Sequence, residues 1–277
     1  MKLSDIFRKK IEKIKSKQTL HDYGFVINTF DLHTEGKIDY AQWQHPYEQT
    51  KSINQEMVNF FRAYSKRGGL AIDIGAHSGD TTIPIALAVG VEGTVLALEP
   101  NPHVFGILKK NSELNKDKTR IIPLDFAATD HDGEFEFNYS DASFCNGGFF
   151  QSLKNKKHGH NYTLRVKGKN LENFLRKEYP GLLDSLCLIK VDAEGYDKEI
   201  IKSLKDIIVE HKPYIISECN KNLISEERSD LFNVLAELGY TIKKLEGFSD
   251  KLQPSSINNP VEMMKWQHFD LVAIPSL

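Results

Sequence analysis

The sequence predicts an α/β fold in which a doubly wound, mostly parallel sheet is covered by helices on both faces. From residue 70 onward, short apolar runs alternate with helical patterns, which is typical of parallel strands joined by helices. The runs are apolar almost without interruption, as strands buried on both faces require. A third indication is a tight loop with Gly75 and Gly79, which links the first apolar run to a helical pattern.

Six apolar runs are predicted to be strands, the last of them closing the sheet. In chain order they are residues 70–75, 94–99, 120–125, 186–192, 213–218 and 269–275. The intervening patterns predict helices at residues 80–89, 102–115, 194–210 and 226–238. Pro102 lies near the start of one helix and Gly239 just past the end of another, which are positions that these residues favour.

Two segments interrupt this alternation. Residues 129–168 combine two alternating apolar and polar runs with the turn-prone Gly147 and Gly148, and they predict a hairpin-like insertion with a mobile tip. Residues 1–60 are predicted to form an N-terminal helix and cap. The sheet and the insertion then belong to one domain of residues 61–277.

Composition and charge exclude several classes of protein. With 277 residues, 40% of them hydrophobic and 27% charged, the chain is typical of globular proteins and not of disordered ones. A formal net charge of -2 provides no basic field, so no nucleic-acid partner is expected. The longest apolar run is too short to span a bilayer and the N-terminus lacks the apolar core of a signal peptide, so we predict a cytoplasmic protein without stable membrane insertion.

The first 18 residues are strongly basic. Leu3, Phe7, Ile11 and Ile14 form one stripe of a predicted helix that lysines surround. Such a helix also suits a membrane surface. Docking on its own domain, or on a second copy of the chain in a homo-oligomer, is the favoured interpretation.

An adenosine cofactor is indicated by the sequence AIDIGAHSGD at residues 71–80. Its glycines let the backbone approach a ligand closely. Glu99 ends the second predicted strand, where an acidic side chain can accept hydrogen bonds from both hydroxyls of a ribose. The loop is not a dinucleotide fingerprint, because His77 and Asp80 replace the later glycines and Asp80 repels a diphosphate.

A nicotinamide-dependent oxidoreductase is therefore disfavoured, and no Gly-Lys-Ser/Thr follows the loop to make it a phosphate-binding P-loop. An acidic residue beside the loop, Asp73, instead suits the ammonium group of a cofactor with an amino-acid part. S-adenosylmethionine is such a cofactor, and it is the one that we predict.

Three stretches, DIGAHSGDTT, LALEPNP and IKVDAEGYDKEII, resemble the FkbM-type family of class I S-adenosylmethionine-dependent methyltransferases. The resemblance implies a Rossmann-like, seven-stranded sheet with an antiparallel last strand. It also implies O-methylation of small hydroxylated acceptors, often sugars. His77 stands where Asn is common in the family, and Asp197 where Glu is usual.

The resemblance further assigns Asp125 and Phe126 to contacts with the adenine ring. The predicted cofactor-binding residues are Asp73, Gly75, Ala76, His77, Gly79, Glu99, Asp125, Phe126 and Asp192.

The candidate catalytic residues lie in IKVDAEG at residues 189–195. If the strand persists, its period of two places Lys190, Asp192 and Glu194 on one side, at the sheet edge where α/β ligand sites form. Asp192 and Glu194 are candidates for cofactor contact and for the general base. Lys190 between carboxylates also suits a plain structural ion pair.

A divalent metal is the alternative use of these acids. Glu218 ends the neighbouring predicted strand, and together with Asp192 and Glu194 it would supply three hard oxygen ligands. No metal is expected, because this grouping is inferred from strand ends alone. Three histidines, His45, His158 and His160, are weaker candidates for the base and are predicted to be surface or packing residues.

The sequence thus predicts an O-methyltransferase that transfers a methyl group from S-adenosylmethionine to a hydroxyl of a sugar or glycan precursor. One alternative is an RNA ribose O-methyltransferase, which the near-neutral charge disfavours. Another is a noncatalytic module of the same fold that binds the cofactor or a partner protein.

Overall fold

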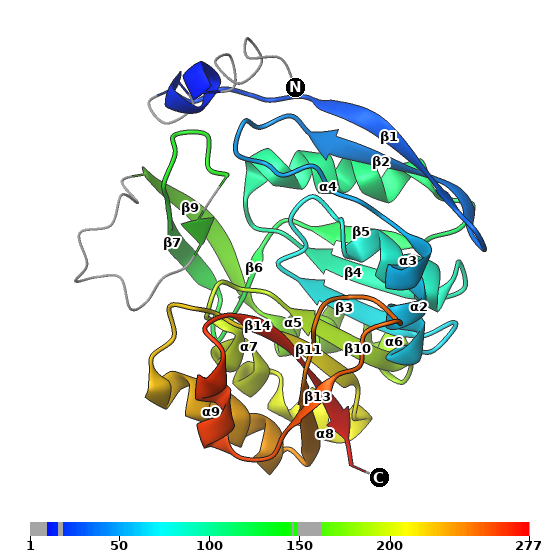
Figure 1. Ribbon diagram of the computed structural model, residues 1–277, viewed down its shortest axis with the longest axis vertical. Helices are drawn as coiled ribbons and strands as arrows, with labels where there is room; N and C mark the ends of the chain where they lie inside the picture. The colour runs from blue at the N-terminus through cyan, green and yellow to red at the C-terminus, as the bar shows by residue number, and fades with distance from the viewer. Residues whose placement is uncertain (1–9, 16–18, 146, 149–161, 277) are drawn as a thin grey trace.

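The computed structural model describes residues 10–15, 19–145, 147–148 and 162–276 (Figure 1). Its centre is an eight-stranded sheet with the order β13-β12-β14-β11-β10-β3-β4-β5. The strands are β3 (Leu70–Ile74), β4 (Thr94–Leu98), β5 (Ile121–Leu124), β10 (Leu186–Val191), β11 (Tyr214–Cys219), β12 (Tyr240–Lys244), β13 (Ser255–Ile257) and β14 (Phe269–Pro275).

The sheet is mostly parallel, as predicted. Strands β5, β4, β3, β10 and β11 run parallel in that order, and β14 is antiparallel to both β11 and β12. The described residues give eight strands instead of seven, because the short β13 pairs with the outer edge of β12. Strand β12 has no counterpart among the predicted strands, since its sequence YTIKK is short and half polar.

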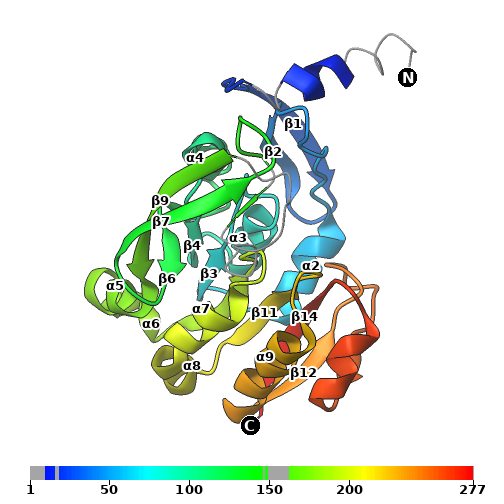
Figure 2. The same ribbon diagram turned by 90° about the vertical axis from the view of Figure 1, so that its left-hand side faces the viewer.

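Helices cover both faces of this sheet. They are α2 (Gln55–Ala63), α3 (Thr82–Val89), α4 (Pro102–Leu114), α5 (Leu171–Glu178), α6 (Pro180–Leu183), α7 (Asp197–Ser203), α8 (Lys205–His211), α9 (Ser225–Glu237) and the 3-10 helix η2 (Pro260–Lys265). Figure 2 shows α2 and α3 on one side of the sheet and α5, α7 and α8 on the other. Alternate residues of β3 face the two layers: Leu70 and Ile72 pack with α5, α7 and α8, and Ala71 packs with α2 and α3.

The helix predicted at residues 194–210 is wrong in its bounds. It begins only at Asp197 and is divided at Leu204 into α7 and α8. The preceding residues cannot be helical, because Glu194 and Gly195 have φ of 52° and 98°. This turn shapes the functional site described below.

The N-terminal segment packs onto the domain through a hairpin of β1 (Phe25–Leu32) and β2 (Gly36–Trp43). Asn111 of α4 holds β2 in place. Its side chain accepts a hydrogen bond from the N–H of Ala41 and donates one to the carbonyl oxygen of Ala41. Residues 10–15 are helical, and Ile11 and Ile14 are about half exposed. This helix contacts the domain at Tyr47, whose hydroxyl donates a hydrogen bond to the carbonyl oxygen of Lys13, while Leu3 and Phe7 of the predicted stripe lie outside the described residues.

A second, four-stranded sheet is formed by the predicted insertion together with the residues that flank it. It consists of β6 (Ala127–Thr129), β7 (Gly133–Tyr139), β8 (Gly147–Gly148) and β9 (Tyr162–Asn170), with β7 antiparallel to β9. The tip that was predicted to be mobile, with His158 and His160, lies outside the described residues apart from Gly147 and Gly148. Within the described ranges, no helix is long and apolar enough to cross a membrane.

Candidate active site

A cavity of about 660 Å³ opens at the carboxyl ends of the parallel strands β3, β4, β5 and β10. This volume lies within the range of about 300–1,000 Å³ that is usual for small-molecule sites. Loops after these four strands form most of its wall, and the insertion, residues 47–51 and the loop after β11 complete it. The predicted site residues that line it are Gly75, His77, Glu99, Phe126, Lys190, Asp192 and Glu194.

The loop after β3 is shaped by its glycines. Gly75 has φ of 77°, and a Cβ atom there would lie 1.9 Å from the carbonyl oxygen of Asp192. Glycine is therefore required for the ends of β3 and β10 to pass each other, which is a different reason from the predicted approach to a ligand. Gly79 has φ of 94° and faces Leu108 of α4, while Ala76 is buried; neither residue belongs to the cavity wall.

Glu99 lies in the cavity wall, and it also organises the loop after β3. One carboxylate oxygen accepts a hydrogen bond from the N–H of His77 at 3.0 Å, and the other from the N–H of Asn101 at 2.8 Å. The residue is buried, and this burial raises the pKa of Glu99. Each oxygen keeps a further lone pair for a ligand.

Asp73 does not line the cavity, contrary to the expectation that it meets a cofactor ammonium group. It is fully buried, and its carboxylate accepts a hydrogen bond from Thr82 Oγ1 at 2.6 Å and lies 3.2 Å from Lys190 Nζ. Burial alone lowers the pKa of Lys190, but the carboxylates of Asp73 and Asp192 raise it above the ordinary value. Lys190 therefore stays charged and takes part in the ion pair that the sequence offered as an alternative.

Asp192 and Glu194 lie together in the wall, although strand alternation does not place them there. Strand β10 ends at Val191, and Glu194 is brought to the cavity by its left-handed turn. Asp192 is 44% exposed, with its Oδ2 atom 3.5 Å from Lys190 Nζ. Desolvation, followed by the charge of Asp192, raises the pKa of Glu194, whose Oε2 accepts a hydrogen bond from Asn220 Nδ2 at 3.1 Å.

Asp197 fixes the turn that carries these two acids. Its Oδ2 atom accepts hydrogen bonds from the N–H groups of Ala193 and Gly195 at 3.2 and 3.3 Å. Its Oδ1 atom accepts from the side chain of Ser217 and the N–H of Glu218. Burial raises the pKa of Asp197 to about 7. Asp197 is buried, and through these hydrogen bonds it fixes the conformation of the loop between β10 and α7.

Glu218 and Asp125 lie outside the cavity wall. Glu218 accepts a hydrogen bond from Asn220 Nδ2 at 2.8 Å, and burial raises the pKa of Glu218 to about 9. Among the residues that the structure describes, no group of three His, Cys, Asp or Glu side chains is arranged to hold a metal ion. Asp125 is exposed, whereas its neighbour Phe126 is buried in the wall and packs edge-on against Phe174.

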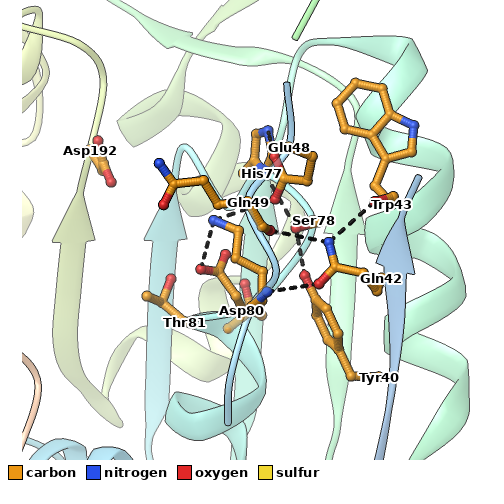
Figure 3. Close-up of polar contacts among 12 residues, drawn as sticks. Tyr40, Gln42, Trp43, Glu48, Gln49, His77, Ser78, Asp80, Thr81 and Asp192 are labelled. Atoms are coloured by element: carbon orange, nitrogen blue, oxygen red, sulfur yellow. Dashed lines mark hydrogen bonds and ion pairs between the residues drawn. The ribbon is translucent and has the colours of Figure 1, made fainter. Parts of the chain in front are cut away.

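The N-terminal segment contributes wall residues that the sequence interpretation missed. We call residues 47–51 the strap; its wall residues are Tyr47, Glu48, Gln49 and Lys51. Gln42 of β2 holds the strap, accepting a hydrogen bond from the N–H of Lys51 and donating one to the carbonyl oxygen of Gln49 (Figure 3). The one signal in the sequence is the stretch WQHPYEQ at residues 43–49, in which Trp43 and Tyr47 suit stacking on a sugar face.

His45 is not a candidate for contact with a ligand in the described structure. Its ring is buried outside the cavity wall, and Nε2 lies 3.3 Å from Asp141 Oδ1 of the insertion. It therefore links the N-terminal segment to the insertion, as a packing residue does.

An open parallel sheet with an acid-lined cavity at its carboxyl edge defines an α/β protein whose ligand site lies where nucleotide-type cofactors bind. The family model described as the methyltransferase FkbM domain matches residues 73–244, which is more than half of the chain. The protein therefore belongs to the FkbM methyltransferase family. This confirms the family prediction.

Several solved structures are similar to this chain at low identity and low TM-score. The FkbM methyltransferase of Methylobacillus flagellatus is 15% identical with a TM-score of 0.41, over 76% of this chain and 43% of that one. A S-adenosylmethionine-dependent O-methyltransferase of Thermotoga maritima is 12% identical with a TM-score of 0.43, over 95% and 97% of the two chains. Fibrillarin of Aeropyrum pernix with bound S-adenosyl-L-methionine is 12% identical with a TM-score of 0.44, over 92% and 97%. No curated protein matches the chain significantly.

Proposed function

We propose that the protein is an O-methyltransferase that acts on a hydroxyl of a sugar or glycan precursor. The chain belongs to the FkbM methyltransferase family, and the observation that carries this proposal is that Glu99, Asp192 and Glu194 lie together in the wall of one cavity. Methyl transfer to a hydroxyl requires that a cofactor be held, that the acceptor oxygen be aligned, and that its proton be removed. The three carboxylates are suited to these tasks.

The cavity residues fit S-adenosylmethionine. The lone pairs that remain on Glu99 are suited to ribose hydroxyls, and the buried ring of Phe126 offers an apolar contact for the purine. Asp192 is proposed to contact the methionine portion. When bound, the cofactor supplies a methyl group that bonds to the acceptor oxygen as its bond to sulfur breaks.

Glu194 is the proposed general base. Its side chain is exposed in the cavity, and Asn220 orients one of its oxygens. The raised pKa makes it more basic than an ordinary carboxylate, which favours transfer of the acceptor's hydroxyl proton to it. Lys190 is a positioning residue in this scheme, because its ammonium group holds Asp192 from below.

The remaining wall supports a sugar as acceptor. Tyr47, Tyr139 and Tyr196 bring aromatic rings to the cavity, and the C–H faces of a sugar pack against such rings. Lys221 and Asn222, from the loop after β11, add hydrogen-bond donors for hydroxyl groups. A mostly polar acceptor with apolar faces matches this combination.

Thermal unfolding with candidate cofactors, followed by transfer of a labelled methyl group to an acceptor panel, tests the proposal. At about 100 times its dissociation constant a ligand adds roughly 2.7 kcal/mol to stability, so S-adenosylmethionine and S-adenosylhomocysteine should raise the melting temperature while NAD and NADP should not. Labelling of sugars or nucleotide sugars is the expected result. Labelling of RNA alone would overturn the acceptor class, and cofactor binding without transfer to any acceptor would favour a noncatalytic module.

The proposal includes two predictions carried by the sequence alone. A cytoplasmic location is tested by cell fractionation, and association of copies of the chain by light scattering of the purified protein.

A further inference from the structure

The strap carries a compact group of charges on the cavity wall. Lys51 Nζ lies 3.0 Å from Asp80 Oδ2 and 3.5 Å from Glu48 Oε1. Glu48 Oε2 in turn lies 3.9 Å from His77 Nε2. Lys51 of the strap therefore lies between the carboxylates of Glu48 and Asp80. Figure 3 shows these two acids beside the loop that follows β3.

The position of this group is fixed by buried hydrogen bonds. Gln42 is 5% exposed, and its side-chain amide bonds the backbone of Lys51, Gln49 and Trp43 at 2.8, 3.2 and 3.2 Å. Tyr40, on the same strand, shares a hydrogen bond of 2.7 Å with Ser78 of the loop. Strand β2 thus holds both the strap and the loop, so that Lys51 and Asp80 meet in a defined geometry.

A buried carboxylate oxygen indicates that the group serves a ligand. The side chain of Glu48 is 6% exposed and lines the cavity. Within the described residues, its Oε1 atom makes no hydrogen bond of ordinary geometry, although it lies 3.5 Å from Lys51 Nζ. Buried polar atoms are nearly always hydrogen-bonded, so the Glu48 carboxylate, which is paired only loosely with Lys51, retains the capacity to accept a hydrogen bond from a ligand.

The cofactor's amino-acid terminus needs such a group. It carries a carboxylate and an ammonium group on one carbon, and therefore requires a cation and an anion side by side. The sequence predicts that Asp73 contacts the ammonium group, but its carboxylate already forms an ion pair with Lys190 and accepts a hydrogen bond from Thr82. The strap contacts the loop after β3 through Asp80. Thr81, the next residue, also lines the cavity and is the N-cap of α3.

We propose that Lys51 binds the carboxylate of the cofactor's amino-acid terminus and that Glu48 accepts a hydrogen bond from its ammonium group. This inference rests on the proposed function, because it concerns the same cavity. It assigns the recognition of the terminus to a segment outside the family-matched residues 73–244, and leaves Asp192 its contact with the methionine portion. Asp80 is then the positioning residue of Lys51, and Gln42 that of the strap.

Charge and burial favour this assignment. Partial burial lowers the pKa of Lys51, but Asp80 and Glu48 raise it above the ordinary value, so the ammonium group stays protonated. Its side chain is 25% exposed, which leaves it accessible from the cavity. The wall residues Tyr196, Lys221 and Asn222 come from other loops, after β10 and β11, and remain for the acceptor.

Calorimetric titration with three adenosine ligands tests the inference without requiring turnover. S-adenosylhomocysteine carries both charged groups, 5′-(3-aminopropylthio)-5′-deoxyadenosine keeps only the ammonium group, and 5′-methylthioadenosine has neither. Lys51→Met should weaken S-adenosylhomocysteine by about ten- to a hundredfold, as expected for a hydrogen bond between charged groups, and leave the other two within about twofold. Lys51→Arg should restore most of the lost affinity.

Two further variants complete the comparison. Glu48→Gln should weaken both ligands that carry the ammonium group and spare 5′-methylthioadenosine. Lys66→Met, an exposed lysine outside the cavity, is the matched control and should leave all three affinities unchanged.

The outcomes separate this inference from the proposed function. If wild-type protein binds S-adenosylhomocysteine and folded Lys51→Met binds it equally well, the inference is wrong and the proposed function stands. Equal weakening of all three ligands by Lys51→Met, with an unchanged melting temperature, also overturns it, because the carboxylate is then not the group recognised. Failure of wild-type protein to bind S-adenosylhomocysteine would overturn the proposed function itself.

Discussion

Lys190 and Asp73 form a buried ion pair between neighbouring parallel strands. They are direct partners in the register of β10 and β3, with Lys190 Nζ 3.2 Å from Asp73 Oδ1 and side chains that are 3% and 0% exposed. Removing two charges from water costs free energy, and the attraction between the charges offsets this cost only when each has its partner. The pair therefore couples the stability of the sheet to the position of Asp192, which lies on the same ammonium group.

Lys190→Met should destabilise the protein by about 3–5 kcal/mol, because it leaves Asp73 as an uncompensated buried charge. The double variant Lys190→Met, Asp73→Asn should recover part of this loss. Urea denaturation measures both. As a matched control, Lys202→Met removes a surface ion pair with Glu199, both partners being over a third exposed, and should cost less than about 1 kcal/mol. Equal effects of the two lysine substitutions would contradict the structural role given to Lys190.

Glu99→Ala should weaken the cofactor and also destabilise the protein. The loss of ribose contacts should reduce the binding free energy of S-adenosylhomocysteine by on the order of 3 kcal/mol. The same change leaves the N–H groups of His77 and Asn101 without their acceptor, at a cost of about 1–3 kcal/mol of unfolding free energy.

Calorimetry and urea denaturation measure the two effects of Glu99→Ala separately. Glu113→Ala, an exposed residue of α4, should change unfolding by less than about 0.5 kcal/mol and binding not at all. Unchanged affinity in folded Glu99→Ala protein would remove Glu99 from the cofactor site.

The sheet and the position of its ligand edge could be predicted because they depend on local patterns. Apolar runs mark the buried strands, and acids at the ends of neighbouring parallel strands must meet at one edge. Glu99, Asp192 and Glu194 therefore reach the cavity wall. Asp73 could not be placed in this way, because its buried environment depends on Lys190, which lies 117 residues further along the chain.

The strap shows a second limit of sequence interpretation. Residues 47–51 have no regular secondary structure and no strand or helix periodicity. Their place in the wall depends on Gln42 and on the packing of β2 against α4, which are tertiary contacts. Similarly, the turn at Glu194 is imposed by Asp197 through backbone hydrogen bonds, whereas the strand period extrapolated past Val191 predicted extended chain. The strap's contacts are long-range and leave no local signal, whereas the bonds from Asp197 to Ala193 and Gly195 are local but lie outside the strand and helix periodicities.

Glu218→Gln should flatten the dependence of stability on pH. Burial, followed by the charge of Asp192, raises the pKa of Glu218 from 4.5 to about 9, so the folded protein holds a proton that the unfolded chain has released in this interval. The free energy of unfolding should therefore fall as the pH rises from 4.5 to about 9. At pH 8 the variant should exceed wild-type stability by on the order of 1–3 kcal/mol.

Urea denaturation at several pH values between 4 and 9 measures this difference. A residual decline below about pH 7 should persist in Glu218→Gln protein, because the pKa of Asp197 is also raised, to about 7. Parallel pH profiles for the variant and the wild type would show that Glu218 is ionised in the folded state.

Asp192→Asn and Glu194→Gln should affect the reaction in different ways. General-base assistance is worth about 10²–10⁴ in rate, so both nearly isosteric changes should lower turnover by that order if the two residues carry the transfer step. Asp192→Asn should also weaken S-adenosylhomocysteine, since Asp192 is proposed to contact the cofactor. Glu194→Gln should leave cofactor affinity alone and reduce turnover or acceptor binding.

The pH profile identifies which acid is the base. A base acts when deprotonated, so wild-type kcat/KM should rise with pH through the raised pKa of Glu194, and Glu194→Gln should abolish that rise. Steady-state kinetics with the best acceptor, calorimetry and melting temperatures distinguish catalysis from folding. Loss of activity with a chelator and recovery with magnesium would instead make Asp192 and Glu194 metal ligands, with Glu218 as the third. If both variants stay folded and turn over at the wild-type rate, the base lies elsewhere, and His160 becomes the next residue to replace.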